Sequence, residues 1–496
     1  MKSSKILVLL NAVVMVMWIF LFVSCEKDVP QSQYEDSDGK LKFMVLSDFH
    51  FMHPALLIND GKAFEEYNAG ECKLLAESGA ILTAAIERIK SYHPAFVIVC
   101  GDMSKDGEII CHEYVAGIFA KLEKETGTKI LVIPGNHDMC NPHSLYYDGS
   151  RTFPAESATE AQFAQIYAGC GYDEAVVRRG ASLDYMAYPA SGIAFIGVNS
   201  NEPNTADELK VQGGLSREQV EWITEMAGMA HAEGRYAIMA MHHNLVDFYD
   251  NAQLIRGSNI ANARYDYDNA SLINDLCSAG IDIVFSGHSH MQSITSATCG
   301  LHTIYSVVTS SMVNLPLAYR KGTIDQGGKL TLWSENLKRC WVPRVANLEA
   351  KGDRYWHELS AYYMKTAADK AWGVAGDILR GTLNFENRDE LEAFLKERFE
   401  GVFYTFLLRT SEGNEDFFTP QKNYEEADAA IQGLLDFFDE KGATSMVELA
   451  SRLLLDASLD DIHAKLRAFF HSAYFNYLGT HPTMPDDRLE IQLTDR

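Results

Sequence analysis

The tetrapeptide Gly135-Asn136-His137-Asp138 constrains this chain more than any other stretch. It follows an apolar run from Lys129 to Pro134 that is typical of a buried strand. A glycine allows a sharp turn where the strand ends, and an amide, an imidazole and a carboxylate follow at once. Buried polar groups without partners cost free energy, and α/β sheets bind ligands at the carboxyl ends of their strands. The tetrapeptide therefore predicts a ligand site.

The same arrangement recurs at four other points in the chain. In each case an apolar run that is typical of a strand ends in a short polar segment with ligand-capable side chains. These segments contribute Asp48 and His50 after residues 41–46, Asp102 after 96–100, His242 after 236–241, and His288 and His290 after 281–286. Five such loops at strand ends predict that their side chains converge.

The pattern between these segments predicts an α/β fold. Helical periodicity over Glu71–Tyr92 and Glu108–Thr126 separates the first three strands, which gives a βαβαβ order and a parallel sheet covered by helices. Further strands and helices are expected to form and cover a second sheet. The strands are Leu183–Tyr188, Ile193–Val198, Leu301–Val308 and Gly328–Trp333, and the helices are Asn269–Ala279 and one opened by the capping box Ser216–Gln219. Residues 41–340 are thus predicted to be a two-sheet βαβ sandwich flanked by helices.

The pattern changes from about Val345. Long amphipathic segments replace the alternation of strands and glycines, so residues 345–496 are predicted to be a separate helical C-terminal region. The segments with the clearest helical periodicity are Asp389–Phe399, Tyr424–Lys441, Ser445–Leu454 and Asp460–Tyr477.

The N-terminus is typical of a targeting segment. The basic residues of Met1–Lys5 precede an apolar run from Ile6 to Val23, and Ser24-Cys25 follows. This pattern resembles the lipobox of bacterial lipoproteins, in which the cysteine is acylated. The resemblance implies a signal peptide over 1–25, a flexible tether over 26–40, and a protein anchored to membrane in the bacterial cell envelope through a lipid on Cys25. A single membrane-spanning anchor is the alternative.

Charge and cysteine content narrow the partners. The formal net charge of −25 repels nucleic-acid polymers, so a phosphate substrate needs local positive charge, which metal ions can supply. Eight of the nine cysteines lie beyond Cys25, and most are expected to be small buried apolar residues.

The five polar loops contain the ligands that two divalent cations need. Neighbouring cations about 3.5–4 Å apart require a bridging anion, and the Asp102 carboxylate on its tight turn can provide it. Asn136 offers a neutral oxygen, and the histidines offer nitrogens. A mixed oxygen and nitrogen set without thiolate suits Mn, Fe, Zn or Ni. A water between two such ions would have a lowered pKa and could attack phosphorus in line.

The ordered motifs Asp-x-His, Gly-Asp, Gly-Asn-His-Asp, His and Gly-His-x-His resemble those of the calcineurin-like metallophosphoesterases, over about Lys42–Trp333. The resemblance implies two metal-ligand groups that share Asp102. Asp48, His50, Asp102 and His290 would hold one ion, and Asp102, Asn136, His242 and His288 the other. It also implies that His137 assists the leaving oxygen or stabilises the transition state, and that Asp138 orients His137. His243 is the alternative to His242.

Departures from related patterns narrow the expected activity. Purple acid phosphatases have a tyrosine where this chain has Lys105, and the arginine that follows the Gly-Asp motif in protein phosphatases is missing. The pattern is more similar to the branch of cyclic-nucleotide and glycerophosphodiester phosphodiesterases. We therefore expect a hydrolase of small phosphodiesters. A phosphomonoesterase or nucleotidase on the same site, or a non-catalytic scaffold lipoprotein, are the alternatives.

Overall fold

The computed structural model describes residues 39–69, 71, 73–246, 269–314, 317–337 and 488–494, with short pieces between 429 and 467. The predicted signal peptide, nearly all of the tether and most of the predicted helical region lie outside these residues. Within that region, residues 462–467 and several between 429 and 440 are helical. Among the described residues, no helix is both long and apolar enough to cross a bilayer.

The first sheet has six strands and contains the predicted βαβαβ unit. Its parallel part is formed by β1, β3 and β4, which the helices α3 and α4 connect. Its antiparallel part extends from the other edge of β1. In spatial order the strands are β16 (Arg488–Gln492), β15 (Lys329–Asn336), β14 (Ala318–Ile324), β1 (Leu41–Leu46), β3 (Phe96–Val99) and β4 (Lys129–Val132), and the helices are α3 (Ser78–Tyr92) and α4 (Ile109–Thr126).

The second sheet has seven strands, and its centre is again parallel. The parallel strands are β9, β10, β11 and β13, and the helices α6 and α7 pack on the outer face. The spatial order is β12 (Ser293–Cys299), β13 (His302–Val308), β11 (Ile283–Ser286), β10 (Tyr236–Met241), β9 (Ile193–Val198), β8 (Tyr185–Ala190) and β7 (Ala175–Arg178). The helices are α6 (Arg217–Ala232) and α7 (Asn269–Ser278). The predicted capping box is present at the start of α6, where the Ser216 side chain accepts from the Gln219 amide.

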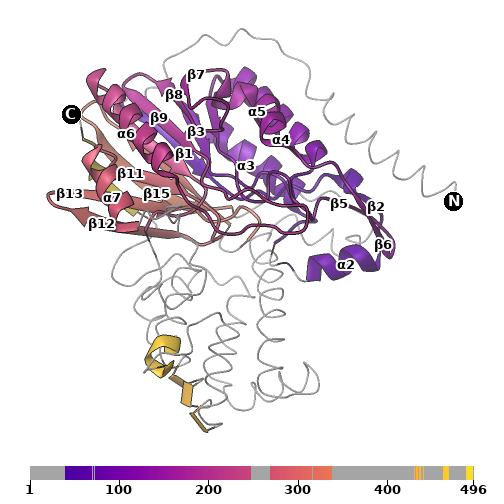
Figure 1. Cartoon of the computed structure of the whole chain (residues 1–496). Helices are drawn as coiled ribbons and strands as arrows, with labels where there is room; N and C mark the ends of the chain where they lie inside the picture. Colours follow the sequence, from indigo (N-terminus) through magenta and orange to yellow (C-terminus); the bar gives the residue numbers. More distant parts are fainter. Residues whose placement is uncertain are drawn as a thin grey trace.

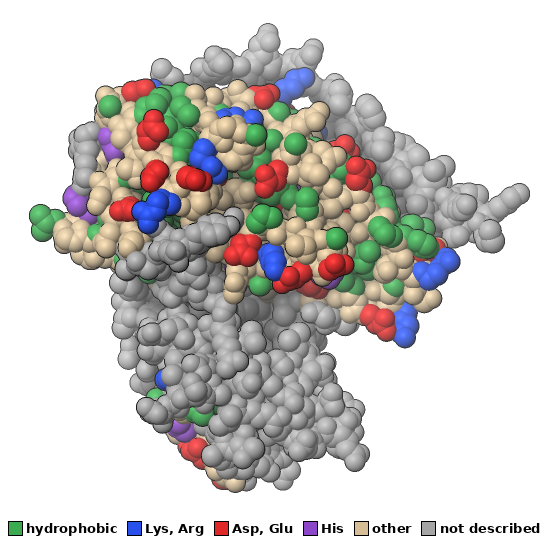
Figure 2. All heavy atoms as spheres, viewed as in Figure 1, with side chains coloured by type: hydrophobic (Ala, Val, Ile, Leu, Met, Phe, Trp, Pro, Cys, Tyr) green, Lys and Arg blue, Asp and Glu red, His purple; other side chains and the backbone are tan. Residues whose placement is uncertain are grey.

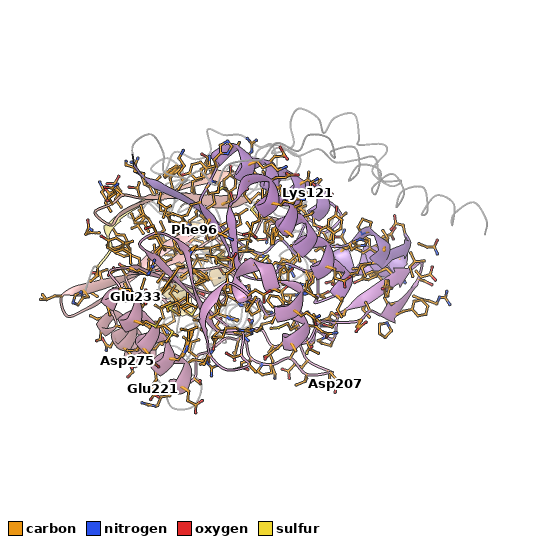
Figure 3. The ribbon with its side chains drawn as sticks, turned by 90° about the horizontal axis from the view of Figure 1, so that it is seen from above. Phe96, Lys121, Asp207, Glu221, Glu233 and Asp275 are labelled. Carbon is orange, nitrogen blue, oxygen red and sulfur yellow. A yellow bond between two sulfur atoms is a disulfide. The ribbon has the colours of Figure 1, made fainter. Side chains whose placement is uncertain are left out.

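The two sheets pack face to face around the main hydrophobic core. Phe43 on β1 stacks on Phe96 of β3 and meets Phe285 of β11 edge-on, with ring centroids 5.4 and 6.0 Å apart. A smaller core fills the space between the second sheet and helices α6 and α7. Figure 1 shows α3 and α4 on the opposite side of this sandwich from α6 and α7. In Figure 3, Phe96 lies inside while Lys121 of α4 and Glu221 of α6 lie outside. The predicted two-sheet α/β sandwich is confirmed.

This packing places the polar loops at one edge. Strands β1, β3 and β4 run parallel in one sheet, and β10 and β11 run parallel in the other. The loops after these strands meet through backbone hydrogen bonds, from Asp48 N to Gly101 O (3.0 Å) and from Gly287 N to His242 O (3.0 Å). The fold therefore brings the five polar loops, which are far apart in the sequence, next to one another.

Several elements differ from the sequence-based expectation. The segment predicted as Gly328–Trp333 in the second sheet is β15 of the first sheet, and the helix predicted from Glu71 begins at Ser78. Strands β7, β12 and β14 were not predicted. A small three-stranded sheet that was not predicted forms a projection at one end of the molecule (Figure 1). The remaining elements are η1 (Pro54–Leu56), β2 (Leu57–Asn59), α2 (Lys62–Ala69), β5 (Leu145–Asp148), β6 (Arg151–Pro154), α5 (Glu160–Ile166) and η2 (Ala168–Tyr172).

Strand β14 escaped prediction because charged side chains interrupt its apolar pattern. Arg320 is fully buried there. Its guanidinium donates to the carbonyls of Val308 (2.6 Å) and Ser293 (3.1 Å) and to the Ser334 hydroxyl (3.0 Å). These partners offset the cost of burying the charge and tie the first sheet to the second.

The cysteines follow the expectation only in part. Cys277 and Cys299 form a disulfide that joins α7 to β12, so these two depart from what was expected of most cysteines. Cys100, Cys111 and Cys170 are buried and free, as expected, while Cys140 is exposed. The other cysteines lie outside the described residues.

The last described strand belongs to the first sheet rather than to the predicted helical region. Strand β16 pairs antiparallel with β15 along Lys329–Trp333. Ile491 and Leu493 join the main core with exposed fractions of 8% and 2%. Thr494 donates from its amide and its hydroxyl to the Asp282 carboxylate in the second sheet. The C-terminal segment thus adds an edge strand to the first sheet and contacts the second.

We predict that Leu493→Ala lowers the free energy of unfolding by about 2–4 kcal/mol, because it removes a buried leucine from a packed core. Thermal unfolding of the two-sheet domain checks this. The control Glu490→Ala removes an exposed side chain whose solvent-screened ion pair with Lys329 contributes little to stability. Equal melting temperatures for Leu493→Ala and the wild type would contradict the placement of β16.

Candidate dinuclear metal centre

The loops at the shared edge hold their side chains on unusual backbone. Non-glycine residues rarely adopt positive φ, although Asp and His tolerate it better than most. Five of the predicted site residues do so here. Each such residue costs about 1–3 kcal/mol, and residues of this kind cluster at functional sites. They are Asp48 (φ 52°), His50 (φ 38°), Asp102 (φ 52°), His288 (φ 67°) and His290 (φ 60°).

The first predicted ligand group is brought together. Asp48, His50, Asp102 and His290 each offer one ligand atom within 4.8 Å of the others. His50 Nε2 lies 3.0 Å from His290 Nε2 and 3.5 Å from Asp102 Oδ2, and His290 Nε2 lies 3.4 Å from Asp48 Oδ1. Two imidazole nitrogens that face each other beside two carboxylates fit a divalent cation between them.

The second predicted ligand group lies directly beside the first. Asn136 Oδ1 lies 3.1 Å from His242 Nε2 and 3.0 Å from His288 Nδ1, and the two histidine nitrogens are 3.3 Å apart. His242 Nε2 is also 3.4 Å from Asp102 Oδ2. The same Asp102 oxygen therefore lies within reach of both groups, which is the geometry that a bridging carboxylate requires.

The geometry also separates His242 from its neighbour His243. His242 Nδ1 donates to the Cys100 carbonyl at 2.7 Å, which aims Nε2 at the site, as partners of metal-binding histidines commonly do. His243 Nδ1 instead lies 2.9 Å from the Ser200 hydroxyl, and its Nε2 lies 3.3 Å from the Val211 carbonyl. His242 is therefore the residue whose ring faces Asp102 and Asn136.

The charge states suit cation binding. Burial lowers the pKa of His50 and of His288 well below the usual value, with help from Lys73 and from His243 respectively. Although burial opposes it, the neighbouring His242 and His137 hold the pKa of Asp102 well below its usual range. Burial likewise opposes ionisation of His242, but Asp102 raises its pKa to about 9. A cation bound here would displace that proton.

His137 faces the site from the loop after β4. Its backbone amide donates to Asp102 Oδ1 at 2.8 Å, and its ring lies edge-on to the His50 ring with centroids 4.9 Å apart. Its Nδ1 lies 2.8 Å from Asp106 Oδ1, and its Nε2 lies 3.5 Å from Lys73 Nζ. One Asp102 oxygen thus positions His137 while the other faces the ligand histidines.

The expectation that Asp138 orients the His137 ring is wrong. The Asp138 carboxylate accepts hydrogen bonds from the Ser104 amide and hydroxyl, each at 3.0 Å, and from the Gly135 amide at 2.9 Å. These bonds fasten the loop after β3 to the loop after β4. Adjacent residues on a tight turn point in different directions, and the fully buried Asp138 carboxylate is bonded to Ser104 and Gly135 instead.

The residue that does orient His137 is Asp106, which was not singled out from the sequence. It is 1% exposed and also accepts from Tyr67 Oη at 2.6 Å and from Lys105 Nζ. Burial alone would raise the pKa of Asp106, but Lys105 and His137 outweigh it and lower that pKa. The sequence signal that could have indicated Asp106 is its position four residues after Asp102, in a loop that was predicted to belong to the site.

Two glycines of the motifs are needed because neighbouring groups approach closely. A Cβ on Gly135 would collide with the Asp102 carboxylate and backbone, and a Cβ on Gly287 would collide with Ser47 Oγ and Asp48 Oδ2. The motif glycines therefore let the loops approach closely enough for their ligand side chains to share a site.

Comparisons with known proteins agree with this geometry. Residues 41–292 match the family model described as calcineurin-like phosphoesterase. A probable cyclic nucleotide phosphodiesterase from Rhodopseudomonas palustris is 29% identical over 129 residues, which cover 26% of this chain and 39% of that protein. The chain thus spans about two fifths of the length of this curated relative.

Solved structures are also similar, at low identity. A dimetal phosphatase from Danio rerio matches with a TM-score of 0.40 and 10% identity, covering 60% of this chain and 96% of that one. A purple acid phosphatase from yellow lupin (Lupinus luteus) matches with a TM-score of 0.37 and 15% identity, covering 60% and 52%.

The family model spans just over half of the 496 residues and includes every predicted ligand. The resemblance inferred from the motifs is thereby confirmed. The chain belongs to the calcineurin-like phosphoesterases, hydrolases of phosphoester bonds that use a pair of divalent metal ions.

Proposed function

We propose that this hydrolase cleaves small phosphodiesters at the two ligand groups that share Asp102. The observation that carries the proposal is the position of Asp102 Oδ2, which lies 3.5 Å from His50 Nε2 and 3.4 Å from His242 Nε2. When bound, a pair of divalent cations supplies Lewis acidity that polarises the phosphoryl group and makes water a better nucleophile. Mn, Fe, Zn and Ni all suit the donor set.

The protein groups around the ligands have separable tasks. Asp48, His50 and His290 would hold one cation, and Asn136, His242 and His288 the other, with Asp102 common to both. His137 presents Nε2 beside the ligands, where it can donate to the leaving oxygen or stabilise the transition state. Asp106 holds the His137 ring through Nδ1, which fixes the nitrogen that faces the substrate.

Two observations support a small diester over other substrates. The partial relative from Rhodopseudomonas palustris is named as a probable cyclic nucleotide phosphodiesterase. On the face drawn in Figure 2, lysine and arginine side chains are interspersed with carboxylates rather than gathered into a basic patch. Together with the net charge of −25, this supports a small substrate held by local charges rather than a nucleic-acid polymer.

We also propose that the protein is a lipoprotein of the bacterial cell envelope that is acylated at Cys25. The pattern of residues 1–25 supports it, and so does the disulfide between Cys277 and Cys299, because disulfides persist in oxidising compartments outside the cytoplasm.

We predict that Asp102→Asn lowers the bound metal from two ions to one or none for each chain and reduces turnover of bis-p-nitrophenyl phosphate at least about a hundredfold. An amide is a weaker bridge than a carboxylate, so both changes are expected together. Elemental analysis and steady-state kinetics measure them. Asp275→Asn, an exposed change on α7, is the control. Two tightly bound ions and unchanged turnover in Asp102→Asn would rule out a bridging role.

We predict that His137→Ala keeps both metal ions but loses about a hundredfold in kcat, the usual size of a lost acid–base group. The ring contributes no ligand atom to either group, so metal content separates its role from that of Asp102. His302→Ala, which removes an exposed histidine at the start of β13, is the control. Wild-type kcat in His137→Ala would contradict the assignment.

We predict that Cys25→Ala moves the full chain, expressed in a bacterial host, from the membrane fraction to the soluble fraction or leaves its leader uncleaved. Incorporation of labelled palmitate measures acylation directly. Unchanged labelling in Cys25→Ala would refute the lipoprotein assignment.

A further inference from the structure

Lys73 brings a positive charge to the ligand groups from a part of the chain that carries no metal-ligand motif. It precedes α3, and the next residue, Leu74, donates from its amide to the Val313 carbonyl at 2.8 Å. Asn314 follows Val313, and its side-chain amide lies 3.3 Å from His290 Nδ1. The backbone that carries Lys73 is therefore fastened to the loop that supports a ligand histidine.

The Lys73 ammonium lies beside the His137 ring. Its Nζ is 3.5 Å from His137 Nε2, the ring nitrogen that Asp106 does not hold, and the His137 ring packs edge-on to that of His50. Its charge also lowers the pKa of His50, second only to burial. Lys105, by contrast, directs its ammonium toward Asp106 and Glu108, away from the metal ligands.

The charge is also held in a poorly solvated position. Lys73 is 6% exposed, and lysines are almost never that buried unless they are paired. Its ammonium forms an ion pair with Glu71, whose Oε2 lies 3.2 Å from Nζ and whose side chain is 28% exposed. A buried ammonium beside a partly exposed carboxylate can exchange that contact for another anion at low cost.

We propose that Lys73 is a substrate-binding residue whose Nζ donates to a nonbridging oxygen of the phosphoryl group, in competition with Glu71. The inference rests on the proposed function, because it needs a phosphoryl group at the shared ligands. Lys73 then supplies the fixed cation that the missing arginine after the Gly-Asp motif does not. A lysine binds phosphate as a point charge, so it accepts diesters and inorganic phosphate alike.

The test is the affinity of the full, manganese-loaded chain for inorganic phosphate, measured by isothermal titration calorimetry with metal content verified. Lys73→Met keeps the length and apolar stem of the side chain but removes its charge. We expect the dissociation constant for phosphate to rise about ten- to hundredfold, as for a lost charge-assisted hydrogen bond, while two metal ions are retained. Lys73→Arg is expected to recover part of the affinity. Lys62→Met on α2, which removes an exposed lysine, is the control.

Glu71→Gln gives an independent test of opposite sign. If Glu71 competes with phosphate for Lys73, removing its charge tightens phosphate binding severalfold. If Lys73 and Glu71 only stabilise the loop, Glu71→Gln leaves the affinity unchanged or weaker, which would overturn the inference even if Lys73→Met fails to fold.

The outcomes also distinguish this inference from the proposed function. Wild-type affinity in a metal-loaded Lys73→Met variant overturns the role of Lys73 and leaves the phosphoesterase assignment standing. A wild-type protein that holds two metal ions but binds no phosphate and cleaves no phosphodiester contradicts the proposed function, and the inference with it.

Discussion

The Asp102 carboxylate is the interaction on which the site depends. One oxygen accepts the His137 backbone amide at 2.8 Å, and the other lies within 3.5 Å of a histidine from each ligand group. A single side chain thus sets the spacing of the two groups and the position of His137. Moving this carboxylate would disturb both ligand groups and the loop that carries His137, because it contacts all three.

The rest of the fold serves to hold strained loops against one another. The ligand residues adopt positive φ at five positions, and each such position costs free energy that packing elsewhere must offset. The sandwich core beneath them is almost fully buried. The bonds from Asp138 to Ser104 and Gly135, and from Arg320 to the ends of β12 and β13, fasten the loops and sheets together. Preorganised loops suit a site that must keep several polar groups close before a cation arrives.

The sequence predicted which side chains converge because parallel strands leave little choice. An apolar strand ending in polar residues must deliver them to the carboxyl edge of its sheet, and five such strands deliver them together. The residues that support the ligands and His137 were harder to predict. Asp138 was chosen over Asp106 as the partner of His137 because it is the next residue in the chain. The direction of a side chain on a turn, however, cannot be read from sequence spacing. Lys73 lies 29 residues before Asp102 in a segment that was predicted to be helical. Strand β14 was hidden by Arg320, whose burial depends on carbonyls from two other strands.

The most direct test of this account is the anomalous diffraction of crystals grown with manganese. The account predicts two manganese peaks about 3.5–4 Å apart, with Asp102 Oδ2 contacting both ions and His137 Nε2 bound to neither. A single peak at full occupancy, or two peaks that do not share Asp102, would contradict it.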